Sequence, residues 1–289
     1  MKVLSLFDGI SCGMVALERA KIPVERYVAY EIDQNAIKVS KKNYPQIEHC
    51  GDVTTADFTR YKGFGALIGG SPCQSLSIVQ SKTRQHLDGK SKLFFEFVRA
   101  KEEMQPKWFL FENVASMNDE SRQAISNCLG CTPIYIDSGL FSAQERPRLY
   151  WTNIPVKLPL VTSSSVLKDV LEKEVDEKYY YNYPLLNIDL SKQVCATMDF
   201  KNHEIHKRVF NPDFKCHTLT TCGGGNTQKK VYINGRARKL TPLEYERLQT
   251  LPDNYTEGVA NCHRYTTCGN GWTVDVIAHI LSFIPKEDY

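Results

Sequence analysis

Short apolar runs alternate with helix-like segments through the first half of the chain. The runs at 2–7, 27–30 and 64–68 are typical of buried strands, and the segments 14–20 and 35–42 have the composition of helices. Strands that alternate with helices build βαβ units, in which the strands lie parallel and helices cover the sheet. The pattern therefore predicts an α/β fold, with an open sheet and helices on both faces.

The same alternation continues to about residue 154 and then stops. Further strands are predicted at 47–50, 108–111, 132–136 and 148–154. Prolines and scattered polar residues replace the pattern up to about residue 262, and a last helix at 273–283 is expected to return to the first domain. We therefore expect a discontinuous first domain at 1–155 and 264–289, and a smaller, irregular domain at 156–263.

Three acidic residues follow three successive predicted strands: Asp8, Glu31 and Asp52. Parallel strands place their carboxyl ends at one edge of the sheet, so these carboxylates can line a single pocket. The turn between Gly9 and Gly13 lets a ligand approach the backbone, but it lacks the full glycine pattern of a dinucleotide site. A nucleoside pocket without a phosphate site fits this set, although each carboxylate taken singly could instead cap a helix.

One cysteine stands at the end of a predicted strand. Cys73 follows the run 64–68 through two glycines, a serine and Pro72, at the place where open α/β sheets present reactive groups. A single cysteine can also be a small buried core residue. The next segment, 74–92, holds five lysine, arginine and histidine residues. It suits either a lid over an anionic substrate or a solvated surface loop.

A glutamate and two arginines are predicted near this cysteine. Glu112 ends the strand 108–111, and one sheet edge can bring Glu112 and Cys73 together. A carboxylate disfavours a neighbouring thiolate, so Glu112 suits proton donation to a heterocyclic base better than activation of the thiol. Arg146 and Arg148 share one face of an extended segment, where they could orient a base, a phosphate or Glu112. An exposed ion-pair face is the alternative.

Composition limits the classes of protein that fit. Apolar residues make up 42% and charged residues 24% of the 289 residues, as in ordinary globular proteins. No stretch reaches the ~18 apolar residues of a membrane span, and an acidic residue comes too early for a signal peptide. We therefore expect a soluble, cytoplasmic protein with ten reduced cysteines and no membrane partner. Cys128-x-x-Cys131 lacks a second pair at zinc spacing, so no metal is expected.

Positive charge is concentrated in one segment of the second domain. Residues 201–240 carry nine Lys and Arg against two Asp and Glu, whereas the net charge of the whole chain is +3. The glycines at 223–225, beside the threonine-rich segment 218–221, allow a close approach to phosphates and to a groove. The segment therefore indicates nucleic-acid binding, with a solvated basic face as the alternative.

Taken together, these residues resemble the C5-cytosine DNA methyltransferase family. The motifs that carry the resemblance lie in the family's order within residues 3–280. They are Phe7-Asp8-Gly9, Gly70-Ser71-Pro72-Cys73-Gln74, Glu112-Asn113-Val114, Gln144-Glu145-Arg146-Pro147-Arg148, Leu240-Thr241-Pro242-x-Glu244 and Gly269-Asn270-Gly271-Trp272. The first motif is similar to that of de novo mammalian members, whereas the length and Pro-Cys-Gln are closer to bacterial or phage enzymes. Ser11-Cys12 stands where many bacterial members have two glycines.

The resemblance implies a DNA (cytosine-5-)-methyltransferase, with a Rossmann-like catalytic domain and a target recognition domain. Such an enzyme transfers a methyl group from S-adenosyl-L-methionine to C5 of a flipped-out cytosine and releases S-adenosyl-L-homocysteine. Cys73 would add to C6 and Glu112 would hydrogen-bond the N3 side of the base. Arg146 and Arg148 would hold the base, its phosphate or the adduct.

The resemblance also implies the binding residues and the partners. The residues expected at the cofactor are Phe7, Asp8, Gly9, Ile10, Cys12, Glu31, Ile32, Asp52, Val53, Pro72, Leu93, Asn270, Gly271 and Trp272. Those expected at the DNA are Gln74, Ser77, Arg84, Thr218, Leu219, Thr220, Lys229, Arg236 and Arg238. The expected partner is double-stranded DNA in a bacterial or phage-infected cell. A cognate restriction endonuclease is a second candidate, and a monomer is favoured.

Three other functions compete with this interpretation. A tRNA cytosine methyltransferase would share the chemistry and differ only in its substrate. A non-catalytic DNA-binding relative would lack Cys73 or Glu112, and both are present. A nicotinamide oxidoreductase would need the pyrophosphate glycines that the first turn lacks.

Overall fold

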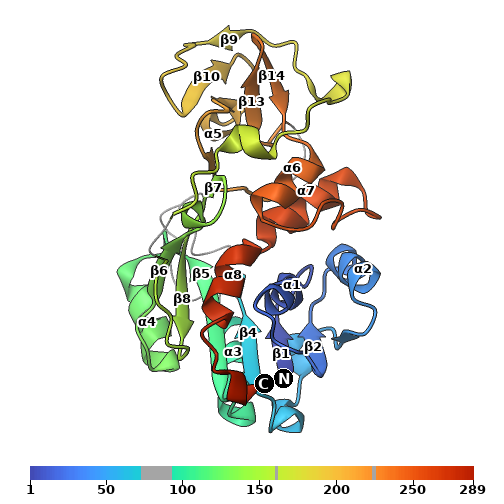
Figure 1. Cartoon of the computed structure of the whole chain (residues 1–289), viewed down its shortest axis with the longest axis vertical. Coiled ribbons are helices and arrows are strands. Elements are labelled where there is room, and N and C mark those ends of the chain that lie inside the picture. Colours follow the sequence, from blue (N-terminus) through green and yellow to red (C-terminus); the bar gives the residue numbers. More distant parts are fainter. Residues whose placement is uncertain (73–92, 160–161, 223–225) are drawn as a thin grey trace. The chain divides into compact units, whose positions relative to one another are not determined.

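The computed structural model describes residues 1–72, 93–159, 162–222 and 226–289 (Figure 1). Four predicted site residues, Cys73, Gln74, Ser77 and Arg84, lie outside the described residues. The chain divides into two compact units. The first unit holds residues 1–137, 147–158 and 274–289, and the second holds 138–146 and 159–273. No helix in the described ranges is both long enough and apolar enough to cross a membrane.

The first unit is built on a seven-stranded sheet with the order β3-β2-β1-β4-β5-β8-β6. Its strands are β1 (Lys2–Leu6), β2 (Arg26–Tyr30), β3 (Glu48–His49), β4 (Ala66–Gly69), β5 (Trp108–Val114), β6 (Ile134–Asp137) and β8 (Pro147–Thr152). The first five are parallel, as the sequence predicts, but β8 runs antiparallel to both β5 and β6. The start of β8 therefore lies at the edge where β5 ends.

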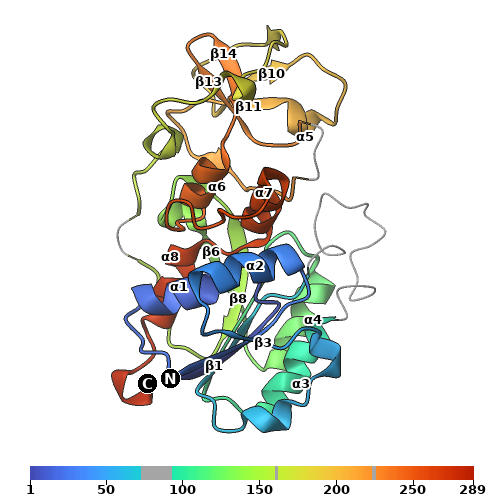
Figure 2. The same cartoon turned by 90° about the vertical axis from the view of Figure 1, so that its right-hand side faces the viewer.

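Helices cover both faces of this sheet. They are α1 (Cys12–Arg19), α2 (Gln34–Asn43), α3 (Phe94–Met104), α4 (Asp119–Leu129) and α8 (Val274–Leu281). Figure 2 shows α3 and α4 together on one face and α1, α2 and α8 on the other. The apolar strand residues and the inner faces of α3 and α4 form a continuous buried core. This layering confirms the predicted α/β class and leaves the carboxyl edge of the parallel strands for polar side chains.

Gly69 at the end of β4 allows close packing at that edge. A Cβ atom at Gly69 would lie 2.7 Å from the carbonyl oxygen of Leu6 and 3.2 Å from the ring of Phe97. Neither a neighbouring backbone nor a buried ring can move far, so position 69 accepts no side chain without a shift of β1 or α3. The segment that leads towards Cys73 thus begins on a tightly held strand.

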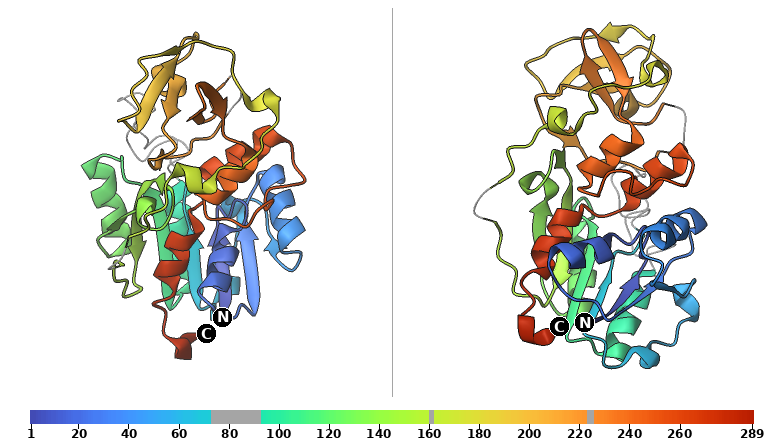
Figure 3. Two further views of the ribbon diagram at one scale, coloured as in Figure 1. Left: turned by 45° about the horizontal axis from the view of Figure 1, so that its top comes forward. Right: turned by 45° about the vertical axis from the view of Figure 1, so that its right-hand side comes forward.

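The second unit contains a five-stranded sheet with the order β14-β13-β11-β10-β9 (Figure 3). Its strands are β9 (Leu185–Leu186), β10 (Val194–Met198), β11 (Arg208–Phe210), β13 (Lys230–Ile233) and β14 (Arg236–Lys239). A two-stranded pair joins β7 (Gln144–Glu145) to β12 (Cys216–His217), and the helices are α5 (Glu204–Lys207), α6 (Pro242–Leu248) and α7 (Asn261–Asn270). The second unit therefore has more regular structure than its composition suggests.

The compact units and the predicted domains differ at three places. The short segment 156–158 packs within the first unit, whereas the sequence pattern assigns it to the second domain. Residues 138–146 and 264–273 pack within the second unit, whereas the sequence pattern assigns both to the first domain. Each of these last two segments is held there by polar contacts of buried side chains, described below. The functional division at 155–156 and 263–264 stays a prediction.

Candidate active site

An ion pair joins the ends of β5 and β8 within the first unit. The Nε of Arg148 lies 2.9 Å from Oε1 of Glu112, and each side chain is only 12% exposed. In the antiparallel register Arg148 faces Val114, two residues along β5 from Glu112, so the two side chains are diagonal neighbours on the sheet. A guanidinium NH group of Arg148 also donates to its neighbour, the carbonyl of Pro147, at 2.8 Å. Arg148 therefore fixes the direction in which the Glu112 carboxylate points.

Asn113 ties the end of β5 to the segment after β4. Its buried amide nitrogen lies 3.4 Å from both the carbonyl oxygen and the hydroxyl of Ser71. Its amide oxygen accepts the backbone N–H of Val114 at 2.8 Å. Ser71 stands two residues before Cys73 in the sequence. Glu112 and the described approach to Cys73 thus belong to one hydrogen-bonded edge of the sheet.

Arg146 has a different environment from Arg148. Its buried guanidinium donates to three backbone carbonyls of the second unit, those of Leu219 at 3.0 Å, Gly269 at 3.0 Å and Gly271 at 3.1 Å. Sequence spacing predicts one shared face for the two arginines, but the structure gives them separate partners. Arg148 forms an ion pair with Glu112, whereas Arg146 donates hydrogen bonds to backbone carbonyls.

The turn between β1 and α1 has an unusual backbone. Phe7, Gly9 and Ser11 all have left-handed φ angles, of 58°, 60° and 60°. Glycine adopts this conformation freely, but in a bulky residue such as Phe7 it is uncommon and costs about 1–2 kcal/mol. Residues held in such conformations occur preferentially at ligand sites. The predicted cofactor turn is therefore a locally strained element whose neighbours hold it in place.

Glu31 supports this turn. Its Oε2 accepts the N–H of Gly9 at 2.8 Å, and its Oε1 accepts the N–H groups of Ile32 and Asp33 at 2.8 Å. Oε1 thus has both of its acceptor sites filled, whereas Oε2 can accept one further hydrogen bond. Ile32 presents an apolar side chain that is 68% exposed beside this carboxylate. A hydroxyl-bearing ligand with a flat apolar part matches this pair of groups.

The other two strand-end carboxylates are held by the protein itself. Asp8 accepts hydrogen bonds from Ser11 and from the Tyr27 hydroxyl, and burial raises the pKa of Asp8. Asp52 is exposed and caps the short turn that follows it, where the N–H and hydroxyl of Thr54 lower the pKa of Asp52. Asp52 therefore caps a turn, and its place at the cofactor stays a prediction. The three carboxylates are not equivalent pocket groups.

The remaining predicted cofactor residues differ in exposure. Ile10, Cys12 and Val53 are buried, so a ligand could reach them only through the main chain. Phe7 and Leu93 are partly buried against the core of the first unit, and Pro72 is half-buried. Asn270, Gly271 and Trp272 lie at the end of α7, in the second unit.

Three of the predicted DNA contacts are buried in the structure, and their role at DNA stays a prediction. They are Leu219, Lys229 and Arg238. Arg238 has its partner within the fold. It forms a bidentate ion pair with Glu244, with N–O distances of 2.6 and 2.8 Å. Burial lowers the pKa of Lys229. A positive sequence segment is therefore not by itself a positive surface.

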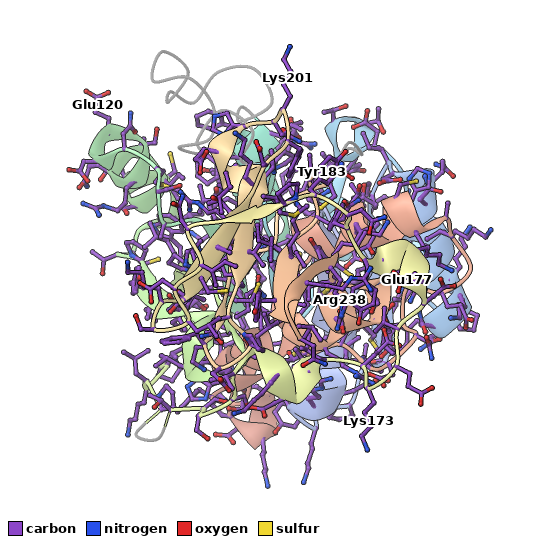
Figure 4. The ribbon with its side chains drawn as sticks, turned by 90° about the horizontal axis from the view of Figure 1, so that it is seen from above. Glu120, Lys173, Glu177, Tyr183, Lys201 and Arg238 are labelled. Carbon is purple, nitrogen blue, oxygen red and sulfur yellow. The ribbon has the colours of Figure 1, made fainter. Side chains whose placement is uncertain are left out.

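The other described DNA candidates lie nearer the surface. The Thr218 hydroxyl donates to the carbonyl of Glu145 at 2.9 Å, and Thr220 is half-buried. Arg236 is exposed and pairs with Glu177. Lys201 is exposed, and Figure 4 shows its side chain projecting outward from the second unit. Exposed positive charge in this segment thus comes from fewer residues than its sequence suggests.

Sequence reasoning did not identify two supporting residues of the site. Tyr27 bonds Asp8 from within β2, where it reads as an ordinary strand aromatic. Arg99 on α3 donates to the carbonyls of Ala56 at 2.8 Å and Val53 at 3.3 Å. The only sequence signal for Arg99 was its spacing from Glu96 and Glu103, which suits pairs on one helix face.

Comparison with known proteins agrees with this architecture. The model of the C-5 cytosine-specific DNA methylase family matches residues 1–129 and 141–286. The chain is 29% identical over 301 residues to the Type II methyltransferase M1.ScrFI of Lactococcus lactis subsp. cremoris, with 96% of this chain and 76% of the relative covered. It is 24% identical over 438 residues to the orphan methyltransferase M.SPBetaI of Bacillus phage SPbeta, with 99% of both covered.

Solved structures share the fold. The Entamoeba histolytica methyltransferase EhMeth superposes with a TM-score of 0.73 at 19% identity, covering 98% of this chain and 97% of that one. The S. pombe Dnmt2 methyltransferase gives a TM-score of 0.69 at 18% identity, with the same coverage. The family match spans nearly the whole chain and confirms the predicted enzyme class, DNA cytosine methyltransferase. This chain belongs to the C-5 cytosine-specific DNA methylase family.

Proposed function

We propose that this protein methylates C5 of a cytosine flipped out of duplex DNA, through a covalent bond between Cys73 and C6. The observation that carries the proposal is the Glu112–Arg148 ion pair at the carboxyl edge of the sheet. The same edge holds Ser71, which Asn113 fixes two residues before Cys73. The reaction needs a nucleophile close to a carboxylate whose direction is fixed. Cys73 follows this edge in the sequence, and Arg148 holds the Glu112 carboxylate.

The chain's residues divide the chemistry between them. The Cys73 thiolate would add to C6 while Glu112 hydrogen-bonds the N3 side, so that electron density moves to C5. C5 would then take the methyl group, its proton would leave, and the bond to the thiol would break to restore the aromatic base. Arg148 would keep Glu112 aimed at the base throughout. C5 and C6 are inaccessible in a base stack, which is why the cytosine must be extruded.

The first unit offers groups that fit S-adenosyl-L-methionine, which supplies the methyl group when bound. Oε2 of Glu31 can accept a hydrogen bond from a ribose hydroxyl, and the exposed Ile32 can pack on the adenine. The turn from Phe7 to Ile10 provides main chain close to the same carboxylate, and Asp52 is exposed beyond the end of β3. The family implies this cofactor in general, and we assign these residues to it.

The reaction is tested with purified protein and cofactor carrying a labelled methyl group. We expect label in duplex DNA and none in tRNA, and a covalent complex with DNA containing 5-fluorocytosine, which cannot lose a proton from C5. Cys73→Ser should abolish both. Unchanged methylation by Cys73→Ser, or label found only in tRNA, would overturn the proposal.

The DNA sequence that the protein methylates would show whether it works together with a restriction endonuclease. One relative is named a type II methyltransferase and another an orphan methyltransferase, so a chain of this kind can stand with or without a restriction partner. We propose duplex DNA in a bacterial or phage-infected cell as the substrate. Bisulfite sequencing of DNA from cells that express the protein identifies the methylated cytosine, and a cognate endonuclease would cut the same sequence.

A further inference from the structure

A chain of buried hydrogen bonds lies behind the turn between β1 and α1. The hydroxyl of Ser11 donates to Oδ2 of Asp8 at 2.5 Å and lies 2.6 Å from the hydroxyl of Ser40 on α2. The hydroxyl of Ser40 lies 3.1 Å from Nε2 of His49, at the end of β3. Ser11 and Ser40 are fully buried. The chain of bonds thus runs from the turn through Ser40 on α2 to His49 at the end of β3.

The direction of this chain follows from its acceptor end. Ser11 donates its one hydroxyl hydrogen to Asp8, so the Ser11 oxygen accepts from Ser40. Ser40 uses its one O–H in the bond to Ser11, so its oxygen accepts from the N–H at Nε2 of His49. The other ring nitrogen, Nδ1, is buried and has no hydrogen-bond partner among the described residues. A neutral ring with its proton on Nε2 satisfies this arrangement.

Ser11 needs such support because of its backbone. It precedes α1 in a left-handed conformation, with φ 60° and ψ 39°, and its side chain makes no capping bond to the helix. A serine is normally placed before a helix because its oxygen caps the first turn in an extended conformation. Here the Ser11 hydroxyl bonds to Asp8 and Ser40 and not to the helix. These two bonds offset the cost of the left-handed backbone.

We infer that Ser40 and His49 are positioning residues that lock the β1–α1 turn, through Ser11, in the conformation that receives the cofactor. Neither side chain need touch the ligand. The same turn presents the N–H of Gly9 to Glu31, so a change in the turn changes the placement of the carboxylate assigned to the ribose. The inference rests on the proposed binding of S-adenosyl-L-methionine by this turn.

The test is a double-mutant cycle on cofactor affinity, measured by calorimetry without DNA. Ser40→Ala should raise the Kd for S-adenosyl-L-methionine about fivefold, the scale of one lost buried hydrogen bond. Glycine adopts the left-handed conformation without support. Ser11→Gly should therefore bind almost normally, and adding Ser40→Ala to it should change the Kd less than twofold. Additive effects in the cycle would overturn the inference.

Control variants separate positioning from general loss of stability. Ser126→Ala on α4 removes a comparable helical hydroxyl, which accepts from the Trp151 ring at 2.9 Å, and should leave the Kd unchanged. If Ser40→Ala does not fold, the pair His49→Gln and His49→Leu decides, because only glutamine keeps an N–H donor: weak binding by His49→Leu alone supports the inference, and equal affinities overturn it. Absence of binding by the wild-type protein would instead overturn the proposed function.

Discussion

Arg148 reaches Glu112 because β8 runs antiparallel to β5. The first residues of β8 then lie at the edge where β5 ends, and Nε of Arg148 comes within 2.9 Å of the Glu112 carboxylate. A parallel β8 would put Arg148 at the opposite edge. Reversal of one strand thus brings a cationic side chain to an edge that parallel strands supply with carboxylates.

Removal of the arginine tests the role of this pair. Arg148→Ala leaves the Glu112 carboxylate without its guanidinium partner, so the carboxylate loses its fixed direction. We expect kcat to fall by about 10²-fold or more, as for loss of one preorganised group at a reacting centre. The Kd for the cofactor should stay within twofold, because Arg148 is not among the residues assigned to it. Single-turnover methylation and calorimetry measure the two quantities.

Two further variants show whether the geometry of the pair matters. Arg148→Lys keeps the charge but not the planar fork, and should recover only part of the activity. Arg122→Ala removes an exposed arginine that pairs with Asp119 on α4, and should leave kcat unchanged. A fully active Arg148→Ala would exclude Arg148 from the reaction.

Arg99 is expected to affect cofactor affinity without touching the cofactor. Its guanidinium binds the carbonyls of Val53 and Ala56 and stacks on Phe58, with 4.4 Å from its central carbon to the ring centroid. Arg99→Gln should free this segment and raise the Kd for S-adenosyl-L-methionine about three- to tenfold, with kcat at saturation little changed. Arg19→Gln, which removes a more superficial pair with Asp275, serves as the control. Equal effects of the two variants would refute the assignment.

Arg238 is expected to act on stability and not on DNA binding. Its pair with Glu244 is fully buried, so Arg238→Met leaves an uncompensated carboxylate and should lower the free energy of unfolding by about 3–5 kcal/mol. Adding Glu244→Leu should recover part of this loss. Urea denaturation measures the stability. The dependence of DNA affinity on salt should keep its slope in the double variant, whereas loss of a phosphate contact would reduce that slope by about one.

The sequence allowed the first unit to be predicted better than the second, for a physical reason. The strands at 2–7 and 27–30 can be predicted from their local apolar pattern, and the polar residue after each strand must lie at the edge of the sheet. Whether a basic residue is buried depends on distant partners. Arg238 is buried because Glu244 meets it, and Arg146 because the carbonyls of Leu219 and Gly269 converge on it. Composition of one segment carries no information about such partners.

Lys230 gives a prediction on pH. Its ammonium group is buried and donates to the carbonyls of His206, Asn226 and Gln228 at 2.7–2.8 Å, and burial lowers the pKa of Lys230 to about 8. In the unfolded chain a lysine keeps its proton up to about pH 10.4. Between these values the unfolded state binds more protons, so the contribution of Lys230 to stability rises with pH.

The comparison that isolates this effect is the wild-type protein against Lys230→Met, by urea denaturation from pH 6 to 10. The difference in free energy of unfolding should be constant below pH 8. Above it, the wild type should gain on the variant by up to about 1.4 kcal/mol per pH unit. Lys201→Met, at an exposed position, should show no such gain. A difference that stays flat or falls above pH 8 would mean that Lys230 keeps its proton in the folded protein, held by its three carbonyl partners.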